Sequence, residues 1–310
     1  MSLSIQLTLL SFALSLVAMK PWLSACLKKG WVSRDVHKPG DRLCVSVGAI
    51  PPIGASIVAL TIYSWLGEDP SIHYVMALSL YTAALGLFDD IAGLTNLEKV
   101  ILAAVPFVFL PPQERIVLWF SLPPALFPAW SALIGTFAVN GVNILAGFNG
   151  LEAGYSSLVA VTLAVHGLLS GNIPLTTSCL VFMAAMLPFL FYNVFPARAF
   201  PGNAGTFYMG GFLAAAALLY TQEWVLLLML APHAFDFLLK ALHWGRTSAK
   251  GRAFISSDGT LRPPPHPSLV GIILRLKPMT EPHLVAAVWA LGVLLALSTF
   301  RLPPLIHSPA

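Results

Sequence analysis

Long apolar stretches separated by short polar connections run through the whole chain. A helix needs about 20 apolar residues to cross the hydrocarbon layer of a membrane, and it satisfies its own backbone hydrogen bonds there. Strand-type alternation of apolar and polar residues is absent, so the pattern predicts about ten transmembrane helices. Their approximate bounds are 3–19, 46–66, 72–88, 99–112, 125–145, 153–170, 175–192, 206–221, 224–243 and 283–300. The proline-rich stretch Leu118 to Pro128 could instead form an irregular or hairpin segment.

Composition supports a lipid environment. Hydrophobic residues make up 57% of the 310 residues and charged residues 10%, whereas soluble domains carry about 25% charged residues. We therefore expect an all-α, polytopic membrane helical bundle in which residues 1–310 form one integral membrane domain in the lipid bilayer. The net charge of +4 is modest, and no basic stripe interleaved with aromatic residues is present, so nucleic acid is not an expected partner.

The distribution of lysine and arginine predicts the orientation. If the predicted helices alternate in direction, all the lysine and arginine residues except Arg115 and Arg301 fall on one side of the membrane. Positive residues concentrate in cytoplasmic loops, so the crowded side is expected to be cytoplasmic. Cys26, Cys44 and Cys179 are far apart in the sequence, which favours neither a disulfide framework nor a zinc site.

Two adjacent carboxylates, Asp89 and Asp90, end the third predicted helix on this side. They repel each other, and the carbonyl end of a helix already carries partial negative charge. A cation should compensate them, and the candidates are Lys99 and a divalent metal ion. A solvated helix end is the alternative interpretation.

Glycine and asparagine gather in two further stretches on the same side. The stretch 140–154 joins the fifth and sixth predicted helices, and its glycines allow backbone N–H groups to approach a bulky anion closely. A tight turn capped by asparagines is the alternative there. The stretch 193–206 places a glycine-rich turn before a helix, which is a common phosphate site.

A long basic connection follows the ninth predicted helix. The interpretation that assigns it no catalytic role is a basic loop that binds lipid headgroups. Its basic residues are Arg246, Lys250, Arg252, Arg262, His266, Arg275 and Lys277. Taken together, the four regions offer oxygen ligands for Mg²⁺ and cations for phosphate oxygens, and phosphoryl transfer depends chiefly on positioning and charge neutralisation.

At these residues the chain resembles the polyprenyl-phosphate N-acetylhexosamine-1-phosphate transferases. It is more similar to the dolichyl-phosphate GlcNAc-1-phosphate transferases of eukaryotes and archaea than to the bacterial phospho-MurNAc-pentapeptide translocase. The matching motifs are GLFDD followed by a lysine, NGVNILAGFNGLEAG, and Asn-x-x-Pro-x-Arg-x-Phe-x-Gly-Asn. A weaker likeness extends from Gly30 to the last helix, whose entry reads LKPMTEPHL.

The resemblance implies ten transmembrane helices and a cytoplasmic site that uses Mg²⁺, with Mn²⁺ as an alternative. The implied substrates are a UDP-N-acetylhexosamine and a polyprenyl or dolichyl phosphate, and a homodimer is left open. At the nucleotide, the resemblance assigns Asn143 to the metal and pyrophosphate and places Asn149 at the uracil edge beside Gly147. Phe200 would stack on the base, and Lys99 would neutralise phosphate oxygens.

The resemblance leaves other residues with supporting roles. Asp89 and Asp90 would orient the lipid phosphate or organise the site. Glu152 would support the nucleotide loop, and Arg198 would fix the loop before Phe200.

Three positions depart from the family pattern. Asn203 stands where the family commonly has a metal-binding aspartate, and its amide oxygen would bind Mg²⁺ more weakly than a carboxylate. The basic motif of the family's inner loop is not intact, so Arg252, Arg262 and His266 are candidates for the sugar and pyrophosphate contacts. His37-Lys38-Pro39 resembles the family's Asn-Lys-Pro, but the acidic and glutamine positions that follow it in the family are replaced around Ser46 and Val47.

The resulting hypothesis is direct displacement: the lipid phosphate attacks the β-phosphorus of UDP-GlcNAc and expels UMP. The product, polyprenyl-diphospho-GlcNAc, would begin glycan assembly. A membrane transporter or flippase is the alternative, and it would use mid-membrane ionisable groups. His233 and Asp236 are the one such pair, and they are expected to bond each other. Short loops favour a prokaryotic plasma membrane, with archaea as a candidate source, over the endoplasmic reticulum.

Overall fold

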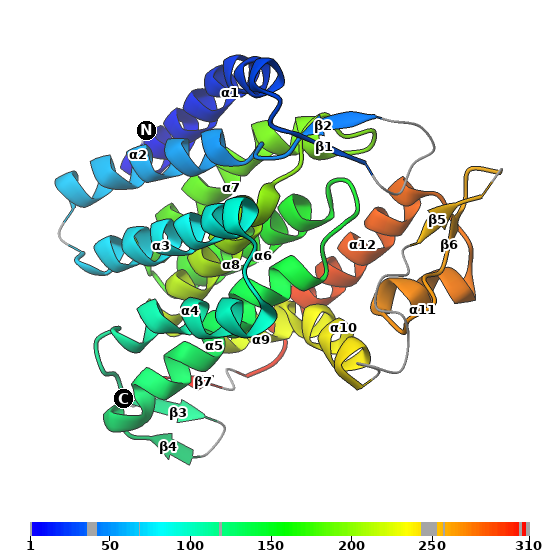
Figure 1. Ribbon diagram of the computed structural model, residues 1–310. Coiled ribbons are helices and arrows are strands. Elements are labelled where there is room, and N and C mark those ends of the chain that lie inside the picture. The colour runs from blue at the N-terminus through cyan, green and yellow to red at the C-terminus, as the bar shows by residue number, and fades with distance from the viewer. Residues whose placement is uncertain are drawn as a thin grey trace.

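The chain folds into a bundle of helices in the computed structural model (Figure 1). The structure describes residues 2–35, 42–67, 69–117, 120–242, 253–256, 258–303 and 306–307. The helices are α1 (Leu3–Lys29), α2 (Ile50–Leu66), α3 (Ser71–Ala92), α4 (Asn96–Val108), η1 (Pro124–Leu126), α5 (Phe127–Ile144), α6 (Leu151–Leu169), α7 (Ile173–Asn193), α8 (Gly202–Leu219), α9 (Glu223–Met229), α10 (Ala231–Leu242), α11 (Leu269–Leu276) and α12 (Glu281–Thr299).

Each predicted apolar segment coincides with a helix, except that the ninth is divided into α9 and α10 with a bend of 57° between them. Pro232 lies in the first turn of α10, and a proline ring cannot continue a preceding helix. Six helices in the described parts of the chain are long and apolar enough to cross a membrane, or seven if α9 and α10 form one span. The all-α membrane class is therefore confirmed, while ten spans and a single domain stay predictions.

Short strands lie at the two ends of the bundle. β1 (Val32–Arg34) pairs with β2 (Leu43–Val45), and β5 (Phe254–Ile255) pairs with β6 (Leu261–Arg262), both antiparallel. At the other end β3 (Arg115–Val117) pairs with β4 (Phe120–Leu122) and with β7 (Ile306–His307). The hairpin alternative for the proline-rich stretch is thus confirmed, and η1 completes the irregular entry to α5.

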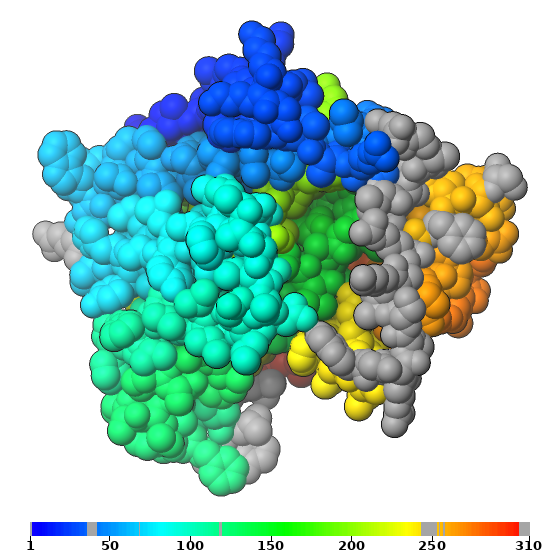
Figure 2. Space-filling view, in the orientation of Figure 1, coloured from blue at the N-terminus to red at the C-terminus, as the bar shows by residue number. Residues whose placement is uncertain are grey.

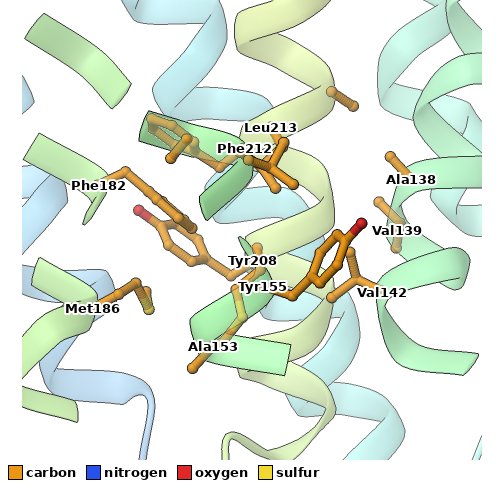
Figure 3. Close-up of a cluster of buried hydrophobic side chains, with 14 of the residues drawn as sticks. Ala138, Val139, Val142, Ala153, Tyr155, Phe182, Met186, Tyr208, Phe212 and Leu213 are labelled. Carbon is orange, nitrogen blue, oxygen red and sulfur yellow. The ribbon is translucent and has the colours of Figure 1, made fainter. Parts of the chain in front are cut away.

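Helix α8 lies at the centre, and every residue from Ala204 to Leu219 is buried. A Cβ at Gly210 would overlap the carbonyl oxygen of Ala138, and a Cβ at Gly211 would overlap Thr82. Small residues let helices approach closely in a membrane, where packing drives their association. Figure 3 shows Tyr208 and Phe212 between side chains of α5 and α7. Close packing around α8 fixes where its N-terminus lies.

The two ends of the bundle differ in their polar contacts. At one end Arg115, almost fully buried, donates to the buried Glu223 at 2.7 Å and joins the β3–β4 hairpin to the α8–α9 junction. At the opposite end the C-termini of α3, α5 and α7 meet the N-termini of α6, α8 and α12. That second end carries the residues predicted to do chemistry.

The expected bond between His233 and Asp236 is wrong. Asp236 instead accepts a hydrogen bond from the backbone N–H of Leu269 at 2.7 Å and pairs with Lys240 at 2.6 Å. The first N–H groups of α11 have no partner within their own helix, so an acceptor on α10 satisfies one of them. The ring of His233 packs edge-on against Tyr155. The pair that the transporter alternative would use therefore holds helices together.

A candidate active site at one end of the bundle

A cavity of about 380 Å³ opens at the end where the predicted motifs meet. Figure 2 shows a hollow in which the green atoms after α5 are visible between the cyan end of α3 and the blue β1–β2 hairpin. Polar side chains, glycines and two phenylalanines make up most of its wall. The lining residues are Ser33, Arg34, Asp35, Ser46, Asp90, Asn143, Ala146, Gly147, Phe148, Asn149, Glu152, Asn193, Phe200, Pro201, Gly202, Asn203 and Thr206.

Asp90 links the C-terminus of α3 to the N-terminus of α8. Its two carboxylate oxygens accept from the backbone N–H groups of Asn203, at 3.0 Å, and Ala204, at 3.2 Å. The first N–H groups of a helix lack partners in the helix and attract negative charge. Gly202 makes this approach possible, because it has a positive φ of 68° and its missing Cβ would lie 2.8 Å from Asp90 Oδ2.

Asp89, the residue before Asp90, is buried, and its carboxylate accepts several hydrogen bonds. Its Oδ2 atom pairs with Lys99 Nζ at 2.6 Å and accepts from Asn203 Nδ2 at 2.8 Å, while Oδ1 accepts from the N–H of Leu94. A capping box between Thr95 and Glu98 starts α4 and so places Lys99 in its first turn. The expectation that Lys99 compensates the carboxylate pair is confirmed for Asp89.

Asn143 reaches the same place from the last turn of α5. Its Oδ1 atom accepts from Thr206 Oγ1 at 2.9 Å, which ties α5 to the first turns of α8. Lys240 of α10 donates to the carbonyl oxygen of Ile144 at 2.8 Å, because the last carbonyl groups of a helix lack partners within it. Asp90, Lys99, Asn143 and Asn203 therefore belong to one connected cluster.

The loop from Gly147 to Gly150 is held by three carboxylates. The N–H of Gly147 donates to Glu152 at 2.6 Å, and the N–H of Asn149 donates to Glu281 at 2.6 Å. Asn149 Nδ2 also donates to Asp35 at 3.1 Å. Gly147 and Gly150 have φ values of 118° and 89°, in a region that side chains disfavour. In Figure 1 this loop lies between β1–β2 and α12.

Phe200 is one of the two aromatic residues on the wall and is half-buried, whereas Phe148 is buried. Its N–H donates to the carbonyl of Val45, and its own carbonyl accepts from the N–H of Gly48, both at 2.8 Å. A Cβ on Gly48 would come within 2.8 Å of that carbonyl oxygen. The extended segment before α8 is thus fixed against the connection between β2 and α2, which leaves the ring on the cavity.

Several predicted binding residues lie elsewhere. Arg198 packs its guanidinium over Tyr192 at 4.6 Å and lines a separate cavity beside Arg42. This agrees with a role in fixing the loop before Phe200, and places its side chain away from the cavity at Asp90. Arg262 is exposed and donates to Ser256 Oγ. His266 is half-buried and, like Arg262, is not among the lining residues. Arg252 and His37-Lys38-Pro39 lie outside the described residues.

Sequence reasoning missed residues that the fold brings to the cavity, such as Asp35, or to the loop that lines it, such as Glu281. Asp35 and Glu281 are both buried and bond to Asn149. Asp35 lies just before the His-Lys-Pro motif, and Glu281 lies in the LKPMTEPHL segment that resembled a family helix entry. Both segments therefore attracted attention in the sequence, but neither sequence indicates that Asp35 and Glu281 contact the loop within 140–154. Thr206 and Arg34 also line the cavity.

The oxygen atoms of the cavity suit a hard cation that shares its ligands with a substrate. No group of three or more His, Cys, Asp and Glu side chains converges as a metal site in the described part of the chain. Asp90, Asn143 and Asn203 nevertheless all line one cavity. Mg²⁺ commonly binds one or two carboxylates and completes its shell with phosphates and water. The residues fit a metal ion that arrives with a phosphorylated ligand.

Comparison with known proteins identifies related chains. Residues 72–221 match the model of glycosyl transferase family 4. A Methanocaldococcus jannaschii protein provisionally named a glycosyltransferase is 34% identical over 228 residues, which covers 72% of this chain and 75% of the relative. A Sulfolobus acidocaldarius protein, provisionally named a UDP-N-acetylglucosamine–dolichyl-phosphate N-acetylglucosaminephosphotransferase, is 27% identical and covers 93% of both chains. A phospho-N-acetylmuramoyl-pentapeptide-transferase of Dictyoglomus thermophilum is 25% identical, covering 73% of this chain and 77% of the relative.

We predict that Gly202→Ala destabilises the protein more than Gly30→Ala. The two glycines have φ values of 68° and 69°, so both substitutions carry a backbone cost of about 1–2 kcal/mol. Only at position 202 would the new Cβ also press on Asp90 Oδ2 and the carbonyl oxygen of Ser46, each 2.8 Å away. Denaturant unfolding in detergent measures the difference. Equal losses for the two variants would show that Asp90 does not depend on this close approach.

Proposed function

The chain belongs to glycosyl transferase family 4, and from this membership and the cavity at Asp90 we propose its reaction. The enzyme transfers GlcNAc-1-phosphate, or a related N-acetylhexosamine-1-phosphate, from a UDP-sugar to a polyprenyl or dolichyl phosphate and releases UMP. The observation that carries the proposal is the convergence of Asp89, Asp90, Asn143 and Asn203 beside a glycine loop and an aromatic ring. This arrangement suits a nucleoside diphosphate sugar.

The nucleoside end of the substrate fits the part of the cavity formed by Phe200 and the Gly147–Gly150 loop. A half-buried aromatic ring offers a face on which a planar base can stack. Asn149 places an amide on the same cavity, and amides read the polar edges of bases. Gly147 lets the ligand approach the backbone, because no side chain stands there. We assign the uridine to this region.

The diphosphate then reaches the region between Asn143, Asn203 and Asp90. The N-terminus of α8 provides positive potential there, but Asp90 already accepts from two of its N–H groups. A diphosphate beside a carboxylate needs additional positive charge. We propose that Asp90, Asn143 and Asn203 hold Mg²⁺, with Mn²⁺ as an alternative, together with the substrate. The bound ion would neutralise charge on the diphosphate as the β-phosphorus is attacked.

The chain's own residues position the reactants and balance charge. A phosphate monoester is largely dianionic at pH 7, since its second pKa is near 6, so the lipid phosphate needs no strong general base. Its oxygen forms a bond to the β-phosphorus while the bond from that phosphorus to the bridging oxygen breaks, and UMP leaves. Lys99 does not itself line the cavity; it pairs with Asp89 and so offsets the charge of the carboxylate next to Asp90.

The lipid phosphate requires a site at the membrane surface. The cavity lies at the end of the bundle that carries most of the lysine and arginine residues, such as Lys28, Lys29 and Lys240. The positive-inside rule assigns this end to the cytoplasm. We propose a multi-pass protein of a prokaryotic plasma membrane, with archaea favoured by the relatives found, and a cytoplasmic active site.

The first experiment measures UMP release by the purified protein in detergent or liposomes. We expect UMP to appear only when UDP-GlcNAc, a polyprenyl phosphate and Mg²⁺ are all present, and we expect the lipid product to carry the sugar phosphate. UDP-GalNAc in place of UDP-GlcNAc tests the hexosamine. Movement of a phosphorylated lipid or solute across liposomes without UMP release would contradict the proposal and favour the transporter alternative.

A second experiment tests the metal through Asn203. In the protein Asn203 Nδ2 donates to Asp89, so Asn203→Asp replaces a donor with a third carboxylate. We expect this variant to need a Mg²⁺ concentration about tenfold lower for half-maximal rate, because Mg²⁺ binds carboxylates more tightly than amides. Asn140→Asp is the matched control, since Asn140 bonds to Thr136 in α5 and does not line the cavity. An unchanged Mg²⁺ requirement in Asn203→Asp would contradict a metal at this position.

A further inference from the structure

The amide of Asn149 is held in one orientation by a buried acid. Its Nδ2 atom donates to Asp35 Oδ2 at 3.1 Å, and both residues are buried, with exposures of 5% and 4%. An ionised carboxylate accepts hydrogen bonds and cannot donate them. Asp35 therefore requires the nitrogen of the amide on its side, so the Asn149 oxygen points away from Asp35.

The neighbouring backbone prevents the loop from rotating to escape this constraint. The N–H of Asn149 donates to Glu281 Oε1 at 2.6 Å. Asp35 follows β1 directly, and its own N–H donates to the carbonyl oxygen of Arg42, which precedes β2. The acid and the amide are thus fixed by three separate segments: the β1–β2 hairpin, the loop after α5, and the start of α12.

The orientation decides which polar group Asn149 offers to a ligand. Asn149 and Asp35 both line the cavity that Phe200 borders. With one of the two Nδ2 hydrogens bonded to Asp35, the amide turns its oxygen, which is an acceptor only, away from the acid. Uracil carries an N–H at ring position 3, whereas cytosine carries a lone pair there. An acceptor that faces this position bonds to uracil and meets an unpaired acceptor in cytosine.

We infer that Asp35 is a positioning residue that sets base selectivity: by fixing the Asn149 amide as an acceptor, it makes the site prefer uridine over cytidine nucleotides. This inference rests on the proposed function, because it assigns the base of the donor substrate to the region of Phe200 and Asn149. Asp35 itself need not touch the nucleotide. Its effect passes through the orientation of one amide group.

Calorimetric binding of UMP and of CMP to the purified full-length protein tests the inference. In Asp35→Asn either orientation of the Asn149 amide becomes compatible with residue 35. We expect the ratio of UMP to CMP affinity to fall by about tenfold, as expected when a fixed hydrogen bond is replaced by a choice of two orientations. An unchanged ratio, including equal weakening of both nucleotides, would overturn the inference and leave Asp35 with a structural role.

The exchange variant Asp35→Asn/Asn149→Asp provides the rescue. The carboxylate introduced at position 149 can only accept hydrogen bonds, and the amide introduced at position 35 can donate one to it. The polarity toward the ligand is thereby restored, and we expect the preference for UMP to return. Loss of preference in Asp35→Asn without recovery in the exchange variant would overturn the orientation argument. If thermal unfolding shows that Asp35→Asn does not fold, the exchange variant alone decides. A retained preference for UMP over CMP supports the inference, and a lost preference overturns it.

The two proposals fail in different ways. If the proposed function is wrong, the unmodified protein neither releases UMP from a UDP-sugar nor binds UMP in preference to CMP. If only the role of Asp35 is wrong, the unmodified protein does both, and the Asp35→Asn variant keeps the same ratio of affinities. Asp258→Asn is a control, because Asp258 is exposed, bonds to Thr260 and does not line the cavity.

Discussion

The contact between the C-terminus of α3 and the N-terminus of α8 is the constraint on which the site depends. At Gly86 a Cβ would overlap the carbonyl oxygen of Asn203, so the two helices meet backbone to backbone. This approach brings Asp90 onto the first N–H groups of α8 and Asp89 within reach of the Asn203 amide. A larger residue at position 86 would separate these groups. The catalytic proposal thus rests on a packing feature of the bundle.

The same contact concentrates negative charge where a diphosphate is proposed to bind. Asp89 is offset by Lys99, and Asp90 by two backbone N–H groups that carry only partial charge. Asn203, at the position where the resemblance implies a metal-binding aspartate, keeps the cluster at two carboxylates. A neutral amide weakens the attraction for a metal ion but avoids a further repulsion when no metal is bound. We therefore expect the ion and the nucleotide to bind together.

Much of the fold could be predicted from hydrophobic periodicity, because a membrane helix must be apolar along its length. The break between α9 and α10 was not predicted, because their combined apolar stretch is long enough for one span. Pro232, in the first turn of α10, was the residue that could have indicated it. In the site, Asp90, Asn143 and Asn203 could be predicted because polar residues at helix ends are conspicuous in an apolar sequence. Asp35 and Glu281 could not be assigned, because each meets Asn149 through the tertiary fold. The expected His233–Asp236 bond failed for the same reason: Asp236 faces α11, a neighbour that helical spacing does not reveal.

An experimentally determined structure with UDP-GlcNAc and Mg²⁺ bound tests the central claim most directly. The account predicts the uracil ring against Phe200 with its edge at Asn149, and the diphosphate and metal ion beside Asn143, Asn203 and Asp90. Nucleotide bound instead at the opposite end of the bundle, for example in the cavity lined by Tyr63, Asp69 and Pro174, would contradict it.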